Sequence, residues 1–421
     1  MTLGESLSLA RFCFRFRRRL ESQPVHCRTA GSGVSDRRLG IRRDKHDLLE
    51  ERGSVDSQLI ATLRLALVSG VGPRTRQALL SRFGDSATVL AASLSELREV
   101  DGVGAKLAES IRRASEEVDV ESQLAICREQ NVRIVTDADD DYPRLLREIH
   151  DPPAVLFVRG GLQPSDAMSI AIVGTRHATH YGLRQAERLA SGLSRAGLTI
   201  VSGLARGVDA AAHRGALEAG GRTLALLGSG VLNVYPPEHD EVARAVINNG
   251  ALLSETPPMH PPKSGSFPQR NRLITGISLG VIVIEASMRS GALISARLAM
   301  EQGREVFALP GRVDSRASTG CHRLIRDGAR LIESVDDVLE ELGPLVEAAP
   351  TDTGQVVHHP AELKLNEQEQ AVLSAIGSET PIIDEVIVLS RLPTQRVLAT
   401  LSVLEMRRLV RRLPGNRVTR M

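Results

Sequence analysis

The chain has 421 residues, of which 42% are hydrophobic and 25% charged, and its formal net charge is +2. This composition excludes a disordered, fibrous or membrane-embedded protein and allows about three domains of roughly 150 residues each. No apolar run reaches the roughly 18 residues that a spanning helix needs, so we expect no membrane span. The cysteines Cys13, Cys27, Cys127 and Cys321 form no CxxC pair, which argues against a disulfide framework or a zinc site. We therefore expect a reducing, cytoplasmic location.

Residues 1–57 form an Arg-rich leader with few branched aliphatic residues. Phe alternates with Arg in RFCFRFRRRL, and Ser, Gly and Arg are frequent in the rest of the leader. Such a segment cannot build a core of its own, so we predict a disordered extension. An organelle transit peptide and a start codon placed too early are the alternatives, whereas the absence of a continuous apolar segment argues against secretion.

Residues 58–138 are predicted to form a small helical domain, because apolar residues recur at helical spacing as far as about Gln130. Two breaks, SGVGP at 69–73 and DGVGA at 101–105, each lead into a basic helix. They resemble the turns of helix-hairpin-helix modules, in which backbone N–H groups at a helix start meet a DNA phosphate. Direct DNA contact and simple close packing of helices are both compatible with this pattern.

Residues 139–342 alternate short apolar runs with helical stretches, which predicts βαβ units and an α/β domain with a parallel sheet. Most of the apolar runs end in Gly, Ser or Glu. Ligands of open parallel sheets bind outside the carboxyl ends of the strands, so we expect the functional site at that edge. The predicted strands lie within 154–160, 168–174, 198–203, 223–229, 251–255, 279–286 and 304–311.

The C-terminal part begins with a predicted linker, 343–364, which contains Pro and acidic residues. Residues 365–421 then offer three amphipathic helices and a Pro-Gly-Asn turn, a pattern typical of a winged helix. The third helix of such domains often enters DNA, but this one carries few outward donors. Contact with protein and contact with DNA are equally compatible with the pattern.

The first predicted turn of the sheet, Gly174-Thr175-Arg176, is expected to contact an anion. A strand that runs through Gly into a helix presents free N–H groups and the positive end of the helix dipole. Arg176 adds a bidentate phosphate donor. The GxGxxG fingerprint is absent, so we expect no nicotinamide or flavin cofactor.

The second turn places Gly203 and Arg206 in a similar arrangement of small residues beside an arginine. Asp209 and His213 follow at helical i,i+4 spacing. They could be an acid-base pair or half of a metal site, but the favoured interpretation is an intrahelical hydrogen bond that fixes the turn.

A third segment, 263–272, has the sequence KSGSFPQRNR and is predicted to be a polar loop. Lys263, Arg270 and Arg272 bring three cations together with Asn271 and Phe267. Because aromatic residues make up only 2% of the chain, Phe267 stands out as a ring on which a base could stack. A buried loop anchor is its alternative role.

Motifs for catalysis are missing, since the chain contains no GxSxG, HExxH or Walker A sequence. Glu255 and Glu285 end predicted strands but have no identifiable catalytic partner. A crevice of small residues, arginines and one aromatic suits an extended polyanion with exposed bases. The sequence therefore favours a non-enzymatic binding protein without a metal or organic cofactor.

Long blocks of the central region resemble the DprA/Smf family, among them IAIVGTRHATHYG, TIVSGLARGVDAAAHRGAL, LGSGVLNVYP and FPQRNRLITGISLGVIVIEASMRSGALISARLA. The resemblance implies an extended Rossmann-like domain that binds single-stranded DNA, between a helical domain and a winged helix. It also implies a homodimer that protects incoming DNA in natural transformation and helps to load RecA onto strands covered by SSB.

On the matching motifs, the resemblance places single-stranded DNA contacts at ten residues. Arg and Lys would hold phosphates, and Phe267 would stack a base. The family is not known as an enzyme, so no catalytic residue is implied. The ten residues are Gly174, Thr175, Arg176, Gly203, Arg206, Lys263, Phe267, Arg270, Asn271 and Arg272.

The alternative function is hydrolysis of nucleoside monophosphates, because related Rossmann-like hydrolases share the βα pattern in outline. Those enzymes hold a phosphate with a PGGxGTxxE signature that also supplies a catalytic Glu. The nearest text here, EASMRSG at 285–291, lacks the signature.

Overall fold

The computed structural model describes residues 57–342, 349–350, 356–357, 367–377, 380–406 and 409–420. The predicted leader up to residue 56 and most of the predicted linker lie outside these residues. No helix within the described ranges is long and apolar enough to cross a membrane.

The N-terminal segment is helical, as predicted. Residues 57–67 form a first helix. Gly70 and Gly102 adopt positive φ angles of +93° and +81° in the two predicted turns, a conformation that glycine adopts at little cost. A core of Leu65, Leu79, Leu97 and Ile111 holds the helices together. The following helices are α2 (Pro73–Phe83), α3 (Ser86–Ala91), α4 (Leu94–Arg98), α5 (Ala105–Arg112), α6 (Ala114–Glu117) and α7 (Val120–Glu129).

The central domain is built on a nine-stranded sheet with the order β1-β2-β6-β5-β4-β3-β7-β8-β9. Every pairing from β6 to β9 is parallel, whereas β2 is antiparallel to both of its neighbours. The strands are β1 (Arg133–Thr136), β2 (Val155–Gly160), β3 (Ser169–Gly174), β4 (Thr199–Ser202), β5 (Thr223–Leu226), β6 (Gly250–Ser254), β7 (Gly280–Ile284), β8 (Glu305–Ala308) and β9 (Arg330–Leu331).

All seven predicted strands are present, and the mostly parallel sheet is confirmed. Two edge strands were not predicted. β1 has four residues and lies inside the 58–138 segment that was expected to be all helical, and β9 has only two residues. Runs this short carry no readable periodicity. The domain boundaries themselves stay predictions.

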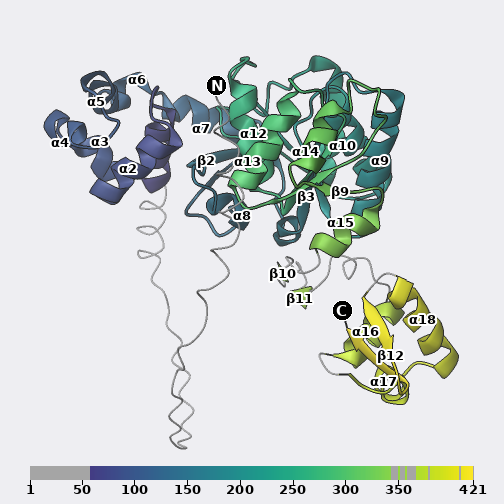
Figure 1. The fold of residues 1–421 in the computed structure, drawn as a ribbon. Coiled ribbons are helices and arrows are strands. Elements are labelled where there is room, and N and C mark those ends of the chain that lie inside the picture. The colour runs from purple at the N-terminus through teal and green to yellow at the C-terminus, as the bar shows by residue number, and fades with distance from the viewer. Residues whose placement is uncertain are drawn as a thin grey trace, which may run out of the picture. The chain divides into compact units, whose positions relative to one another are not determined.

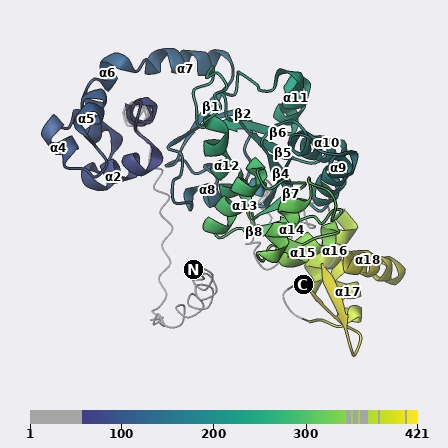
Figure 2. The same ribbon diagram turned by 45° about the horizontal axis from the view of Figure 1, so that its top comes forward.

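Helices cover both faces of the sheet (Figure 1, Figure 2). Side chains alternate along a strand, so Ile170 and Ile172 of β3 face one layer while Ala171 and Val173 face the other. The first layer contains α9 (His180–Arg195), α10 (Val208–Glu218) and α15 (Val335–Leu342). The second contains α8 (Arg144–Arg147), α12 (Ser266–Gly276), α13 (Gly291–Glu301) and α14 (Thr319–Arg326).

A third apolar cluster covers the β1–β2–β6 side of the sheet. Phe157 and Leu252 pack there with Ala243 of α11 (Asp240–Asn249) and with Val120 of α7. Two short 3-10 helices, η1 (Pro164–Ala167) and η2 (Pro237–His239), complete the domain.

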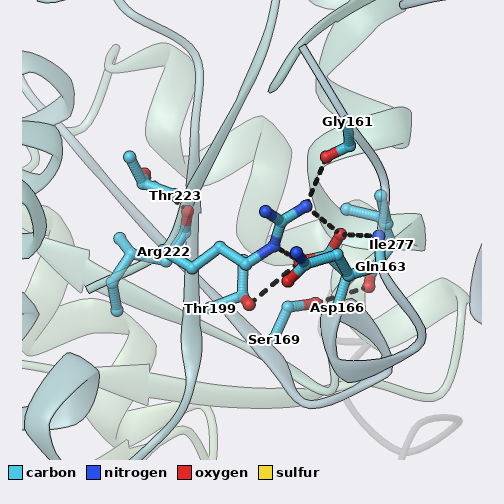
Figure 3. Close-up of polar contacts among 9 residues, drawn as sticks. Gly161, Gln163, Asp166, Ser169, Thr199, Arg222, Thr223 and Ile277 are labelled. Atoms are coloured by element: carbon cyan, nitrogen blue, oxygen red, sulfur yellow. Dashed lines mark hydrogen bonds and ion pairs between the residues drawn. The ribbon is translucent and has the colours of Figure 1, made fainter. Parts of the chain in front are cut away.

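The amino ends of the central strands are joined by a buried ionic network (Figure 3). The carboxylate of Asp166 accepts hydrogen bonds from Arg222 Nε at 2.6 Å, from Thr199 Oγ1 at 3.1 Å and from the backbone N–H of Gln163. Arg222 Nη2 also donates to the carbonyl of Gly161. The network ties η1 to the starts of β4 and β5.

The C-terminal domain is a winged helix, as predicted. Helices α16 (Glu367–Ile376), α17 (Ile383–Ser390) and α18 (Thr394–Met406) are followed by a hairpin of β12 (Val410–Leu413) and β13 (Arg417–Arg420). Their common core contains Val372, Val386, Leu401 and Val418. Two further short strands, β10 (Ala349–Pro350) and β11 (Val356–Val357), pair with each other.

Candidate functional site

A crevice opens where the connections of the sheet change direction. β3 lies between β4 and β7, so the chain leaves β3 toward one side of the sheet and later continues from β7 toward the other. Open α/β sheets bind ligands at such a switch point. A cavity of about 640 Å³ lies here, beyond the carboxyl end of β3 and between the starts of α12 and α13.

The structure brings most of the ten predicted site residues to this cavity. Six of them line the cavity directly. A smaller hollow is lined by three of these six and also by Gly203 and Arg206. Lys263 is exposed in the segment before α12 and does not line either space, and Arg272 points elsewhere. The six lining residues are Gly174, Thr175, Arg176, Phe267, Arg270 and Asn271.

The prediction of a polar loop at 263–272 was wrong for residues 266–272. α12 begins at Ser266, so Phe267, Arg270 and Asn271 lie on the first turns of a helix. Pro268 is tolerated there because the first helical N–H groups have no intrahelical acceptor. The segment has a mostly polar sequence, which concealed its helical period.

Arg176 and Phe267 form a stacked pair at the mouth of the cavity. The guanidinium carbon of Arg176 lies 5.3 Å from the centre of the Phe267 ring, a cation–π distance. Tyr235 approaches the same ring with centroids 5.7 Å apart. Gly228 lies against the ring as well, since a Cβ there would come within 2.9 Å of it. Phe267 is thus fixed, and Arg176 is held over it while its side chain remains exposed.

Arg270 forms the floor of the cavity. Its residue is only 5% exposed, and its Nη1 donates to the carbonyl of Leu226 at 2.7 Å. Burial lowers the pKa of Arg270 to about 10, an effect that the negative charge of Asp209 partly offsets. Its Nε has no hydrogen-bond partner among the described residues. A cation in this position lacks full compensation and favours an anion in the cavity.

Gly203 is required for this arrangement. A Cβ at position 203 would lie 1.7 Å from Nη1 of Arg270, closer than any real contact. The second turn therefore allows the Arg270 guanidinium to lie against the backbone of Gly203. Arg206 of the same turn is exposed and pairs with Glu238.

Arg272 does not face the crevice, contrary to the prediction. Its side chain is 8% exposed, and Nε lies 3.3 Å from the carboxylate of Asp151. Nη2 is also bonded to Glu255. Both carboxylates compensate the guanidinium, so Arg272 anchors α12 to the segment before β2 and to the end of β6.

The favoured hydrogen bond between Asp209 and His213 is also absent. Asp209 instead accepts from the backbone N–H groups of Gly203 at 3.1 Å and Ala205 at 3.4 Å. His213 Nδ1 lies 2.7 Å from Thr223 Oγ1. Burial raises the pKa of the Asp209 carboxyl and lowers the pKa of His213 to about 3. The two side chains serve different parts of the fold.

The helix that follows the first turn is not open to an anion. α9 begins at His180, and the carboxylate of Glu285 accepts from Thr179 N at 2.8 Å and from Thr179 Oγ1. Glu285 therefore occupies the place that was predicted for a phosphate. The start of α13, capped by Ser290, lines the cavity instead.

Tyr235 and Ser287 line the cavity but were not among the predicted residues. Tyr235 precedes a cis proline in the connection between β5 and α11. Its aromatic character in a polar connection was a readable signal, whereas Ser287 carries no chemical signature in the sequence.

Comparison with known proteins assigns all three folded parts. Residues 133–343 match the family model for DNA recombination-mediator protein A, and residues 357–416 match the DprA winged helix domain. The chain belongs to the DprA/Smf family. Residues 63–117 match the SAM-like helix-hairpin-helix tandem, in agreement with the two glycine turns.

Individual relatives agree with this assignment. The chain is 36% identical over 384 residues to Protein Smf of Synechocystis sp., which covers 84% of this chain and 96% of that protein. It is 45% identical over 203 residues to DNA processing protein DprA of Streptococcus pneumoniae, covering 48% of this chain and 72% of that protein. The X-ray structure of DprA from the same organism superposes with a TM-score of 0.58 at 36% identity, covering 66% of this chain and 95% of that one.

Proposed function

We propose that this chain binds single-stranded DNA in the crevice of its Rossmann-like domain and acts as a recombination mediator, not as an enzyme. One observation carries the proposal. Arg176 is exposed and held over Phe267 at the mouth of a cavity whose floor holds the buried Arg270. No carboxylate among the described residues pairs with Arg176.

The chemistry of the lining supports a polynucleotide ligand. Arg176, Arg270 and the start of α13 offer positive charge and N–H donors to phosphate oxygens. Phe267 and Tyr235 are adjacent rings beside these donors, and aromatic side chains bind bases of any identity. Phosphate donors and aromatic rings side by side fit an unpaired strand, whose bases are exposed.

Membership of the family supports a role in DNA processing. On the resemblance, we further propose that the protein protects incoming DNA during transformation and helps to load RecA onto strands covered by SSB. We also propose that it acts in the cytoplasm as a homodimer. Sedimentation at micromolar concentration tests the dimer, and a monomer mass would contradict it.

The test of the crevice is a titration of a fluorescent single-stranded oligonucleotide at several salt concentrations. Arg176→Ala should weaken binding and reduce the slope of log affinity against log salt by about 0.7, the value for one single-strand phosphate contact. Arg195→Ala is the matched control, because Arg195 is exposed at the last residue of α9, at the opposite end of that helix from the crevice. Equal slopes for wild type and Arg176→Ala would contradict the proposed site.

Arg272→Ala sharpens the same experiment. Because Arg272 is bound to Asp151 and Glu255, its removal should lower the unfolding midpoint and leave the salt slope of the folded protein unchanged. A flattened slope would show that Arg272 contacts a phosphate after all.

The hydrolase alternative finds no support in the geometry. Neither Glu255 nor Glu285 lines the 640 Å³ cavity, and each is engaged by another side chain. Asp209 reaches the cavity, but its carboxylate accepts two backbone N–H groups. Incubation with nucleoside monophosphates should release no base, and release would favour the enzyme.

A further inference from the structure

The winged helix divides its charge sharply along the chain. Residues 365–393 contain five acidic residues and one arginine, whereas residues 394–421 contain seven arginines and one glutamate. The second set comprises α18 and the β12–β13 hairpin (Figure 1). We call the hairpin, residues 410–420, the wing. A small domain with net charge near zero therefore carries a concentrated positive region.

The strand register decides which arginines face outward. Val410 and Val418 are buried in the domain core, so the face that they share with Arg412 and Arg420 points inward. The opposite face presents Arg411 and Arg417, which are both exposed. Side chains alternate strictly between the two faces of a ribbon.

The single acidic residue of the basic half is already used. Glu405 Oε2 lies 3.3 Å from Nε of Arg412, on the inward face. Among the residues that the structure describes, Arg417 Nη1 donates only to the backbone carbonyl of Thr380, at 3.0 Å. Arg411 has no hydrogen-bond or ion-pair partner in the described part of the domain. The outward arginines keep their charge uncompensated.

The same region has no aromatic side chain that could recognise bases by stacking. Residues 365–421 contain no Phe, Tyr or Trp, so no ring is available on which an unpaired base could stack. On α18, Ser402 is bonded to Leu398 and Arg412, and Leu398 itself is exposed. The other exposed side-chain donors of α18, Thr394, Gln395 and Arg396, lie in its first turn and are not part of the wing.

We propose that the wing is a second nucleic-acid site, which holds the phosphate backbone of duplex DNA without reading its sequence. Duplex DNA presents about one charge per 1.7 Å of its axis, a density that suits arginines without aromatic partners. The crevice and the wing would then hold different DNA forms. This inference does not depend on the crevice, since the two sites share no residue.

The test uses the full chain and two 30-base-pair duplexes of unrelated sequence. Arg411→Gln combined with Arg417→Gln should weaken binding of both duplexes about tenfold at moderate salt and reduce the log–log salt slope by about 1.8, two contacts at 0.9 each. Affinity for a single-stranded oligonucleotide should stay unchanged. Arg411→Gln alone leaves the hydrogen bond between Arg417 and Thr380 in place and should reduce the slope by only about 0.9, the value for one contact.

Two further variants make the result decisive. Arg195→Gln combined with Arg326→Gln removes the same charge from the exposed ends of α9 and α14 and should leave duplex binding unchanged. Arg411→Lys combined with Arg417→Lys should retain the slope, because a backbone contact needs only the charge. Unchanged duplex binding by the glutamine pair would overturn the proposal and favour a protein partner. An equal loss of single-strand and duplex binding in the glutamine pair would overturn it too. So would a reduced salt slope in the lysine pair.

Discussion

Arginine side chains have different electrostatic environments at the two ends of the central sheet. At the amino ends of the strands, Arg222 is enclosed by Asp166 and by the carbonyl of Gly161 (Figure 3). At the carboxyl ends, Arg176 stacks on Phe267 without a carboxylate, and Arg270 lies buried with one carbonyl acceptor and only partial compensation from the charge of Asp209. Compensated charge stabilises the fold at one end, and incompletely compensated charge is available to a ligand at the other.

Arg272 shows that the distinction is not simply one of position. It lies two residues from Arg270 on α12, yet Asp151 and Glu255 make it part of the compensated set. Neighbours in sequence therefore have different roles, because successive residues of a helix point in different directions.

The largest expected effect comes from breaking the compensated end. Asp166→Ala leaves Arg222 buried without its carboxylate and should cost about 3–5 kcal/mol of unfolding free energy. Urea unfolding measures this loss. Asp314→Ala, which breaks an exposed pair with Arg312, should change the midpoint little. Similar losses for both variants would contradict the structural role of the Asp166 network.

Acid should weaken the same end by a smaller amount. His213 contacts Thr223, the residue after Arg222, and burial lowers the pKa of His213 from 6.5 to about 3. Between these pH values His213 is protonated in the unfolded chain but not in the folded chain, so stability falls as the pH drops below 6.5. The loss from this group should reach about 2 kcal/mol at pH 5, at 1.36 kcal/mol per pH unit.

The variant His213→Asn isolates that contribution. It retains a donor for Thr223 Oγ1 but does not titrate, so its stability should decline less between pH 6.5 and pH 5 than that of wild type. Parallel pH profiles would assign the acid sensitivity to other groups.

A smaller effect should follow at the uncompensated end from Gly203→Ala. The new Cβ would displace the Arg270 guanidinium, and loss of one charge-assisted contact should weaken single-strand binding about tenfold. Gly265→Ala is the control, because a Cβ at position 265 meets no atom within 4 Å. Wild-type affinity in Gly203→Ala would show that the position of Arg270 does not matter for binding.

The sequence was sufficient for much of the fold. Apolar runs such as MSIAIVG and LGVIVIEA are long enough to be read as buried strands, and β3 and β7 lie where they were predicted. It failed at β1 and β9, where two to four residues join an edge that exists only once the rest of the sheet has formed. The start of α12 was missed because its exposed residues are polar and its buried ones include two arginines.

By itself, the sequence determined the three kinds of domain, the family and the segments that surround the crevice, because periodicity and local motifs are properties of neighbouring residues. Only the tertiary structure decided which cations are free. Arg272 pairs with Asp151, which is more than a hundred residues away in the sequence, and with Glu255, which is seventeen residues away. Glu285 accepts a hydrogen bond from Thr179 over a separation of 106 residues. Whether an arginine is compensated depends on such distant carboxylates, and no local pattern records them.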